Sequence, residues 1–222
     1  MSPNQKTLDG SYLAPASGQA SSMVVFLHGY GANGDDLLSM GESWAKELPN
    51  TVFLGPNAPA VCEAWAQGYQ WFSIRALEKG AMAERERQIA EAAPILNNFI
   101  DEQLEHWKIP DNKLVVVGFS QGAMMAMYTM PRRRKPCAGV IAYSGMLIGG
   151  EGLKTPGTVR MPILAIHGDA DEVVPPDSLD YVEKGFSAAG FDYEVIMRPN
   201  VGHQIDHFSF MRGLSFIQKV FE

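Results

Sequence analysis

The chain alternates short apolar segments with longer amphipathic ones, and this alternation limits the folds that it can adopt. Six short runs rich in β-branched residues lie at 23–27, 51–54, 114–117, 139–143, 162–166 and 193–197. Most are apolar throughout, as in strands that are covered on both faces. Helical patterns lie between or after them, at 36–48, 81–107, 121–130, 178–189 and 207–221, with Pro94 a candidate point of interruption. The alternation predicts a mostly parallel sheet with helices on both faces.

Composition limits the function classes. A chain of 222 residues is most simply one domain, 1–222. The net charge of −7 argues against a nucleic-acid partner, and the one basic run, 132–135, is expected to be a solvated loop. Neither a transmembrane segment nor a signal peptide is recognisable, which makes a cytoplasmic protein the expectation. Cys62 and Cys137 are then expected to be free thiols, with a disulfide as the alternative.

The carboxyl ends of parallel strands are where active sites form, so the loops after the strands matter most. The run at 114–117 leads into Gly118-Phe-Ser-Gln-Gly122 and then into a helical pattern. A strand that becomes a helix within a few residues must bend sharply, and glycines suit such a bend. Ser120 at the tip would project beside a helix N-terminus, as a nucleophile requires. The G-x-S-x-G pattern alone also arises by chance.

A serine nucleophile needs a base and a carboxylate that orients the base. The loop after 162–166 offers Asp169 and Asp171, of which Asp169 is expected to close a turn. His203 follows a glycine after the last strand. Ser120, Asp171 and His203 therefore occur in the chain order of an α/β-hydrolase triad. A metal site made of His167, Asp169, Asp171 and His203 is an alternative by residue type, but it would leave the serine turn unexplained.

The loop after the first strand reads His28-Gly-Tyr-Gly-Ala-Asn-Gly34 and matches the dinucleotide pattern G-x-G-x-x-G. That reading also needs a carboxylate after the second strand, and the sequence there, Gly55-Pro-Asn-Ala-Pro59, has none. An H-G-x-G turn has another use, because its backbone can donate to an oxyanion. The expected donors are the N–H groups of Tyr30 and Gln121.

With these motifs in view, the sequence resembles the phospholipase/carboxylesterase family of small α/β-hydrolases, which includes the acyl-protein thioesterases. The resemblance runs from about residue 22 to 221. It rests on these segments: Phe26-Leu-His-Gly-Tyr-Gly31, Asn57-Ala-Pro59, Trp71-Phe72, Gly118-Phe-Ser-Gln-Gly122, His167-Gly-Asp-Ala-Asp171, Val174-Pro175 and Gly202-His203. It implies a single-domain α/β-hydrolase fold with Ser120 as nucleophile, Asp171 as carboxylate and His203 as base. Ala123 and Ser73 depart from the family pattern, where many relatives have Gly and Asp.

The function expected from the residues and the resemblance is hydrolysis of carboxylic esters or thioesters of short-to-medium acyl chains, without a metal or other cofactor. Partners would be small acyl substrates, with an acylated protein, a lysophospholipid and a homodimer left open. Candidate acyl-binding residues are Trp71 and Phe72, in a pocket-side loop at 60–80, and Val174, in the loop that carries Asp171. Core packing explains the aromatic residues equally well. A dinucleotide oxidoreductase, a metallohydrolase and a non-catalytic acyl-binding protein are the competing classes.

Overall fold

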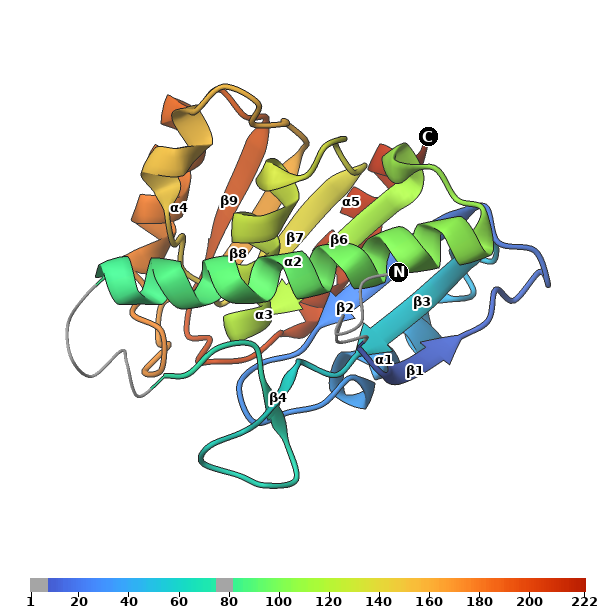
Figure 1. Ribbon diagram of the computed structural model, residues 1–222, viewed down its shortest axis with the longest axis horizontal. Coiled ribbons are helices and arrows are strands. Elements are labelled where there is room, and N and C mark those ends of the chain that lie inside the picture. Colours follow the sequence, from blue (N-terminus) through green and yellow to red (C-terminus); the bar gives the residue numbers. More distant parts are fainter. Residues whose placement is uncertain (1–7, 75–81) are drawn as a thin grey trace.

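The computed structural model describes residues 8–74 and 82–222, whose main feature is a seven-stranded sheet in the order β1-β3-β2-β6-β7-β8-β9 (Figure 1). Apart from the edge strand β1, which runs antiparallel to β3, all neighbouring strands are parallel. The strands are β1 (Gly10–Leu13), β2 (Ser22–Leu27), β3 (Thr51–Pro56), β6 (Leu114–Phe119), β7 (Gly139–Tyr143), β8 (Ile163–Gly168) and β9 (Tyr193–Arg198).

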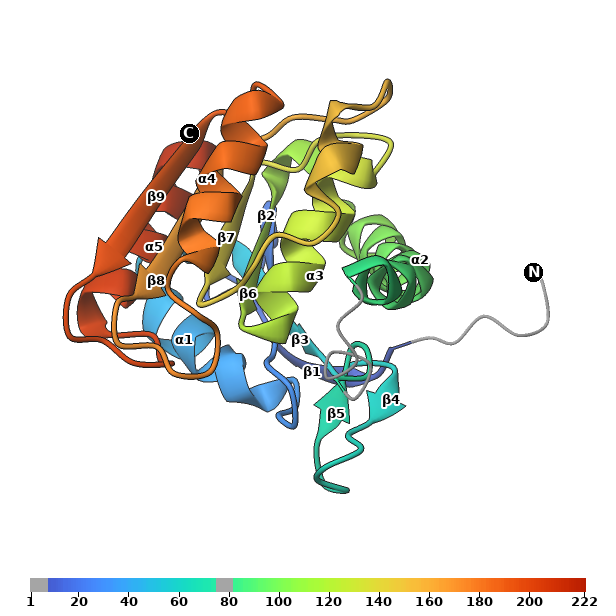
Figure 2. The same cartoon turned by 90° about the vertical axis from the view of Figure 1, so that its left-hand side faces the viewer.

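In the described part of the chain, five α-helices cover the sheet, three on one face and two on the other (Figures 1 and 2). Helices α2 (Met82–Trp107), α3 (Gln121–Thr129) and α4 (Ser178–Ala188) pack on one face. Helices α1 (Asp35–Trp44) and α5 (His207–Phe221) pack on the other. Short 3-10 turns lie at Asp111–Lys113, Met130–Arg132 and Gly150–Lys154. This layering confirms the predicted α/β class.

The uniformly apolar strands explain why both faces must be covered. Along β2, Met23, Val25 and Leu27 belong to the core beneath α2, α3 and α4. The intervening Val24 and Phe26 belong to the core beneath α1 and α5. All five side chains are fully buried, because successive side chains of a strand point to opposite faces.

Sequence periodicity located the six long strands and five helices, but several details were wrong. Pro94 does not interrupt α2, which is one helix containing the proline. Helix α1 ends at Trp44, residues 45–47 continue only as a turn, and residue 48 is irregular. The strand β1 and a small hairpin, β4 (Ala60–Val61) with β5 (Tyr69–Gln70), were not predicted. They are too short to show a period.

The basic run at 132–135 is only partly the solvated loop that was expected. Arg133 is buried and pairs with Asp101 and Asp111, while the guanidinium of Arg132 donates to backbone carbonyls. Arg134 and Lys135 are exposed. Two of the four cations therefore anchor the end of α3. Among residues 8–74 and 82–222, no helix combines the length and the apolar character needed to cross a bilayer.

Candidate active site at the carboxyl edge of the sheet

Ser120 occupies the sharp turn between β6 and α3. Its backbone has φ 53° and ψ −116°, a conformation that costs a non-glycine residue energy and is often found at functional sites. The flanking glycines allow the turn to close. A Cβ on Gly118 would lie 2.4 Å from the carbonyl carbon of Gly122, and a Cβ on Gly122 would lie 1.9 Å from Leu27 O. Glycine is therefore needed at both positions because backbone packs directly against backbone there.

Neighbouring backbone holds the turn in place. Ser120 N–H donates to Tyr143 O at the end of β7, and Ser120 O accepts from Met124 N–H in α3. Ser120 itself is 8% exposed. Gln121 is the first residue of α3, and the first N–H groups of a helix have no partner within the helix. These N–H groups make the start of α3 favourable for developing negative charge.

Asp171 and His203 meet at the same edge of the sheet. Asp171 Oδ2 accepts from His203 Nδ1 at 2.8 Å, and Asp171 Oδ1 accepts from the N–H groups of Val173 and Val174, each at 2.9 Å. Burial alone would raise the pKa of Asp171, but the hydrogen bonds from His203, Val174 and Val173 together lower it below its ordinary value. Asp171 is therefore a carboxylate at neutral pH, able to stabilise an imidazolium.

Bonds between the loops after β8 and β9 fix this meeting. Asp169 N–H donates to Arg198 O, and Ala170 N–H donates to Val201 O, each at 3.0 Å. Asp169 Oδ1 accepts from Asn200 N–H at 2.6 Å. The sequence predicted that Asp169 would close a turn; in the structure, its carboxylate bridges the two loops. Asp171 is thus the aspartate that contacts His203, and Asp169 holds the two loops together.

The imidazole of His203 also lies beside the serine turn. Its ring packs against the ring of Phe119, with 4.8 Å between the ring centroids. Phe119 is the residue directly before Ser120. Of the three residues expected to form the triad, Asp171 and His203 are therefore in contact, and His203 packs against the residue next to Ser120.

The side chain of Gln121 has a role that the sequence did not indicate. Its Oε1 accepts from Trp71 N–H, and its Nε2 donates to Phe72 O, each at 2.8 Å. The Trp71 indole donates to His28 O at 3.0 Å. One amide thus ties the segment after β5 to the serine turn, and the indole ties it to the end of β2. The presence of a glutamine in the G-F-S-Q-G motif is the only sequence feature that could have pointed to this role.

The β4–β5 hairpin, which projects from the molecule in Figure 2, is bonded to the glycine-rich loop after β2. Gly31 N–H donates to Tyr69 O at 2.9 Å, and Tyr69 N–H donates to Ala32 O at 2.8 Å. The loop that carries Tyr30 is therefore held by Tyr69 through the two residues that follow Tyr30. Two glycines of this loop have other structural reasons: Gly31 has a positive φ of 78°, and a Cβ on Gly34 would lie 1.8 Å from Gly55 O in β3.

His28 at the end of β2 hydrogen-bonds to nearby backbone. Its Nδ1 donates to Gly29 O at 2.7 Å, and its Nε2 accepts from Ala58 N–H at 3.0 Å. Burial lowers its pKa, so the ring is neutral at pH 7. Burial, with Cys62 beside the hydroxyl, raises the pKa of Tyr30. The side chains of His28 and Tyr30 are therefore both neutral at pH 7.

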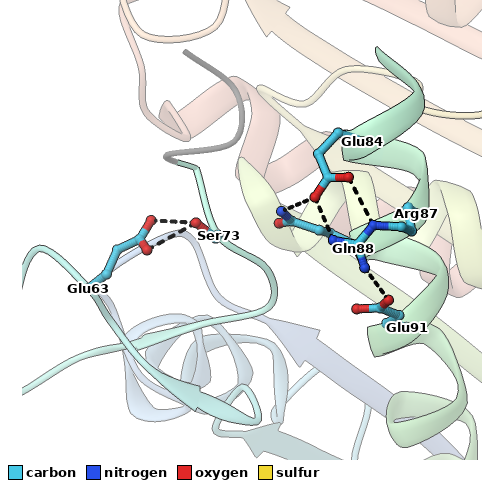
Figure 3. Close-up of polar contacts among 6 residues, drawn as sticks. All are labelled: Glu63, Ser73, Glu84, Arg87, Gln88 and Glu91. Carbon is cyan, nitrogen blue, oxygen red and sulfur yellow. Dashed lines mark hydrogen bonds and ion pairs between the residues drawn. The ribbon is translucent and has the colours of Figure 1, made fainter. Parts of the chain in front are cut away.

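Ser73, where many family members have Asp, is bonded to a carboxylate from another residue (Figure 3). Ser73 Oγ contacts both carboxylate oxygens of Glu63, at 2.9 and 3.0 Å, and Ile74 N–H donates to the same group at 3.1 Å. Glu63 lies in the β4–β5 hairpin, so this contact holds the chain just before residues 75–81, which lie outside the described part. Of the predicted 60–80 loop, residues 60–74 are described and residues 75–80 are not.

The candidate acyl-binding residues are all buried in the core. Trp71 and Phe72 line a cavity of about 340 Å³ beside α2, with Pro59, Ala60, Ser73, Arg87, Gln88, Glu91, Ala92 and Ile95 as its other lining residues. Figure 3 shows Arg87 of this set between Glu84 and Glu91 on α2. Val174 is 4% exposed, and its backbone N–H contacts Asp171. Core packing is therefore part of the role of all three residues.

The metal alternative finds no support in the geometry. Within the described part of the chain, His, Cys, Asp and Glu side chains nowhere gather in threes in a way that could hold a metal ion. Asp169 is bonded to backbone, and Asp171 is bonded to His203 and to backbone N–H groups. Cys62 and Cys137 are both buried free thiols.

Comparison with known proteins assigns the chain that forms this site to a family. Residues 9–221 match the model of the phospholipase/carboxylesterase family. The chain belongs to that family. The "acyl-protein thioesterase 1 homolog 1" of Dictyostelium discoideum is 29% identical over 206 residues, which are 88% of this chain and 89% of the relative. The "acyl-protein thioesterase 1" of Candida albicans is 30% identical over 94% of this chain and 96% of its own length.

A solved structure agrees with this assignment. The crystal structure of esterase PE8 superposes with a TM-score of 0.92 at 35% identity, and it covers 97% of this chain and 100% of its own. The predicted family, the α/β-hydrolase fold and the class of carboxylesterase- or thioesterase-like hydrolase are confirmed.

Proposed function

We propose that this hydrolase cleaves carboxylic esters or thioesters of short-to-medium acyl chains through an acyl-enzyme on Ser120. His203 takes the hydroxyl proton as Ser120 Oγ attacks the substrate carbonyl, and Asp171 stabilises the resulting imidazolium. Protonated His203 then gives its proton to the leaving alcohol or thiol. Water, activated by the same imidazole, releases the acid and restores Ser120.

The backbone N–H groups of Tyr30 and Gln121 are the proposed oxyanion donors. Gln121 N–H lies at the start of α3, and Tyr30 lies in a loop that is bonded to the β4–β5 hairpin. Fixed donors of this kind need no reorganisation as charge develops. In comparable sites, removing one such donor costs about 2.7–4 kcal/mol of transition-state stabilisation.

The observation that carries the proposal is the 2.8 Å bond between Asp171 Oδ2 and His203 Nδ1, formed beside the strained turn of Ser120. This bond leaves Nε2 as the nitrogen free to accept a proton, provided that Nδ1 carries the hydrogen. Each residue comes from a different loop, and bonds between the loops hold it. A scaffold loop would not need the strained backbone of Ser120.

The substrate class rests on the family and on the apolar surroundings. The relatives named thioesterase and esterase favour an acyl substrate, and an acylated protein or a lysophospholipid would present the same bond as a small ester. The buried Trp71, Phe72 and Val174 favour an acyl chain of limited length. We propose no metal or other cofactor for the reaction, and a cytoplasmic location for the enzyme.

Covalent labelling tests the mechanism. A fluorophosphonate probe should modify Ser120, as peptide mapping would show, and EDTA should not change the rate. Ser120→Ala should abolish labelling and lower kcat by several orders of magnitude. Ser39→Ala, on an exposed part of α1, is the matched control and should label as the wild type does. Normal turnover by Ser120→Ala would refute the proposal.

Kinetics on acyl chains of increasing length tests the substrate. The p-nitrophenyl esters and the matching thioesters should give a maximum of kcat/KM at a short or medium chain. A value that keeps rising through long chains would contradict the proposed length, without affecting the assignment of Ser120.

A further inference from the structure

A second histidine touches the carboxylate of Asp171. His167, the penultimate residue of β8, is 1% exposed. Its Nε2 lies 3.3 Å from Asp171 Oδ2, the same oxygen that accepts from His203 Nδ1 at 2.8 Å. In the structure, one carboxylate oxygen lies against two imidazoles.

The neighbours of His167 Nε2 determine which nitrogen carries the proton. Nε2 is 3.0 Å from Val174 O, and a carbonyl oxygen can only accept. Nε2 must therefore carry a hydrogen, which it donates to Val174 O. The positive end of this N–H dipole then also lies close to Asp171 Oδ2.

These contacts form a closed ring that includes the backbone N–H and C=O of Val174, the carboxylate of Asp171 and the imidazole of His167. Its N–H donates to Asp171 Oδ1 at 2.9 Å, and its C=O accepts from His167. Val173 N–H adds a second bond to the same Oδ1. The turn from 171 to 174 is thus tied back to β8, which is paired on both sides, with β7 and with β9. Asp171 cannot rotate without losing bonds to two backbone N–H groups.

We propose that His167 is a positioning residue for the reaction. It fixes the 171–174 turn to β8, so that Asp171 Oδ2 points at His203 Nδ1, and its N–H balances part of the charge on that oxygen. A buried imidazole costs desolvation, which an apolar residue would avoid. The two contacts of His167 Nε2 offset that cost, and they also hold Asp171 in its orientation. The inference rests on the proposed Ser120–His203–Asp171 mechanism.

Paired substitutions test the role. His167→Leu removes the donor at similar volume, whereas His167→Gln places an amide N–H near the position of Nε2. Misplacing a reacting group by about 1 Å costs about 100-fold in rate. We therefore expect His167→Leu to lower kcat by about 10- to 100-fold with little change in KM, and His167→Gln to recover most of this loss.

A spectroscopic readout separates positioning from general destabilisation. The proton shared by His203 Nδ1 and Asp171 should give a low-field NMR signal that His167→Leu shifts or broadens and His167→Gln preserves. Ile163→Val, at the other end of β8, is the stability control and should leave both kcat and this signal unchanged. Should His167→Leu fail to fold, His167→Asn replaces it, because its amide is too short to reach the position of Nε2.

The outcomes are distinguishable. The inference is overturned if the donor-free variant keeps the kcat and the low-field signal of the wild type, or if His167→Gln, although folded, loses as much kcat as that variant. If Ser120→Ala retains activity, the proposed function itself fails. If Ser120→Ala is inactive while His167→Leu is fully active, only the role of His167 is refuted.

Discussion

Asp171 and His203 are 32 positions apart in the chain, yet Asp171 Oδ2 and His203 Nδ1 lie 2.8 Å apart. The two loops that carry them are joined by backbone bonds, and Asp171 also accepts from two N–H groups of its own loop. The orientation of the carboxylate is therefore set by the scaffold before any substrate binds. Preorganisation of this kind is what a base such as His203 needs in order to work in the correct tautomer.

Replacing the carboxylate of Asp171 should disable the base. In Asp171→Asn, an amide can present N–H to His203 Nδ1 and so favour the wrong tautomer, an effect worth about 10,000-fold in kcat in a serine protease triad. We expect a loss of that order, measured as kcat on a p-nitrophenyl ester. Binding of substrate should change much less.

The neighbouring Asp169 supplies the matched control. Asp169→Asn keeps an oxygen that can accept from Asn200 N–H, so the loop bridge survives. Its kcat should stay close to the wild-type value. Equal losses in the two variants would mean that Asp171 is not distinguished from Asp169 in the reaction.

The N-cap of α5 should make stability depend on pH. Asp206 accepts from Ser209 N–H and pairs with Arg198. Burial alone would raise its pKa, but the hydrogen bonds from Ser209 and Arg198 and the charge of Arg198 together lower it. Removing such a cap costs about 0.5–2 kcal/mol. Asp206→Ala should lower the free energy of unfolding by that amount at pH 7.

The sign of the pH effect follows from linkage. The unfolded carboxyl has a pKa of about 3.9, and the folded one lies lower. The contribution of Asp206 is therefore complete above about pH 4 and is lost as pH falls through the folded pKa. Urea unfolding curves of wild type and Asp206→Ala should converge below that point. A difference that stays constant down to pH 2 would contradict this account.

A methyl group on Gly122 should disrupt the serine turn. Inside a helix such as α3, Ala is normally favoured over Gly by about 1 kcal/mol. In Gly122→Ala, however, the new Cβ would lie 1.9 Å from Leu27 O, and overpacking of this kind costs about 1–3 kcal/mol or more. We expect a lower urea midpoint and a loss of labelling at Ser120. A stabilised, active variant would show that the turn is not closely packed.

The amide of Gln121 should couple stability to substrate binding. Gln121→Met keeps the backbone N–H but leaves Trp71 N–H and Phe72 O without this partner, at a cost of about 1–3 kcal/mol for each buried group. We expect a lower melting temperature and a higher KM for acyl substrates. Gln67→Met, at an exposed position between β4 and β5, is the control and should change neither quantity.

Much of the site could be predicted because its residue types recur in fixed sequence contexts. Ser120 lies in G-x-S-x-G between a strand and a helix, and His203 follows a glycine before the last helix. The apolar runs were enough to place the strands and therefore the edge at which these loops meet. Asp171 was preferred to Asp169 because Asp169 was expected to close a turn, and the structure places Asp171 against His203.

The sequence by itself determined the α/β class, the order of the elements and the candidate triad, because periodicity and short motifs are local properties of a chain. Only the tertiary structure placed His167 against Asp171, Gln121 against Trp71 and Phe72, and Glu63 against Ser73. Each of these contacts joins groups from different segments: His167 in β8 to the loop after it, Gln121 in α3 to the segment after β5, and Glu63 in the β4–β5 hairpin to Ser73. Such contacts depend on distances across the packed sheet edge, which residue spacing along the chain does not encode.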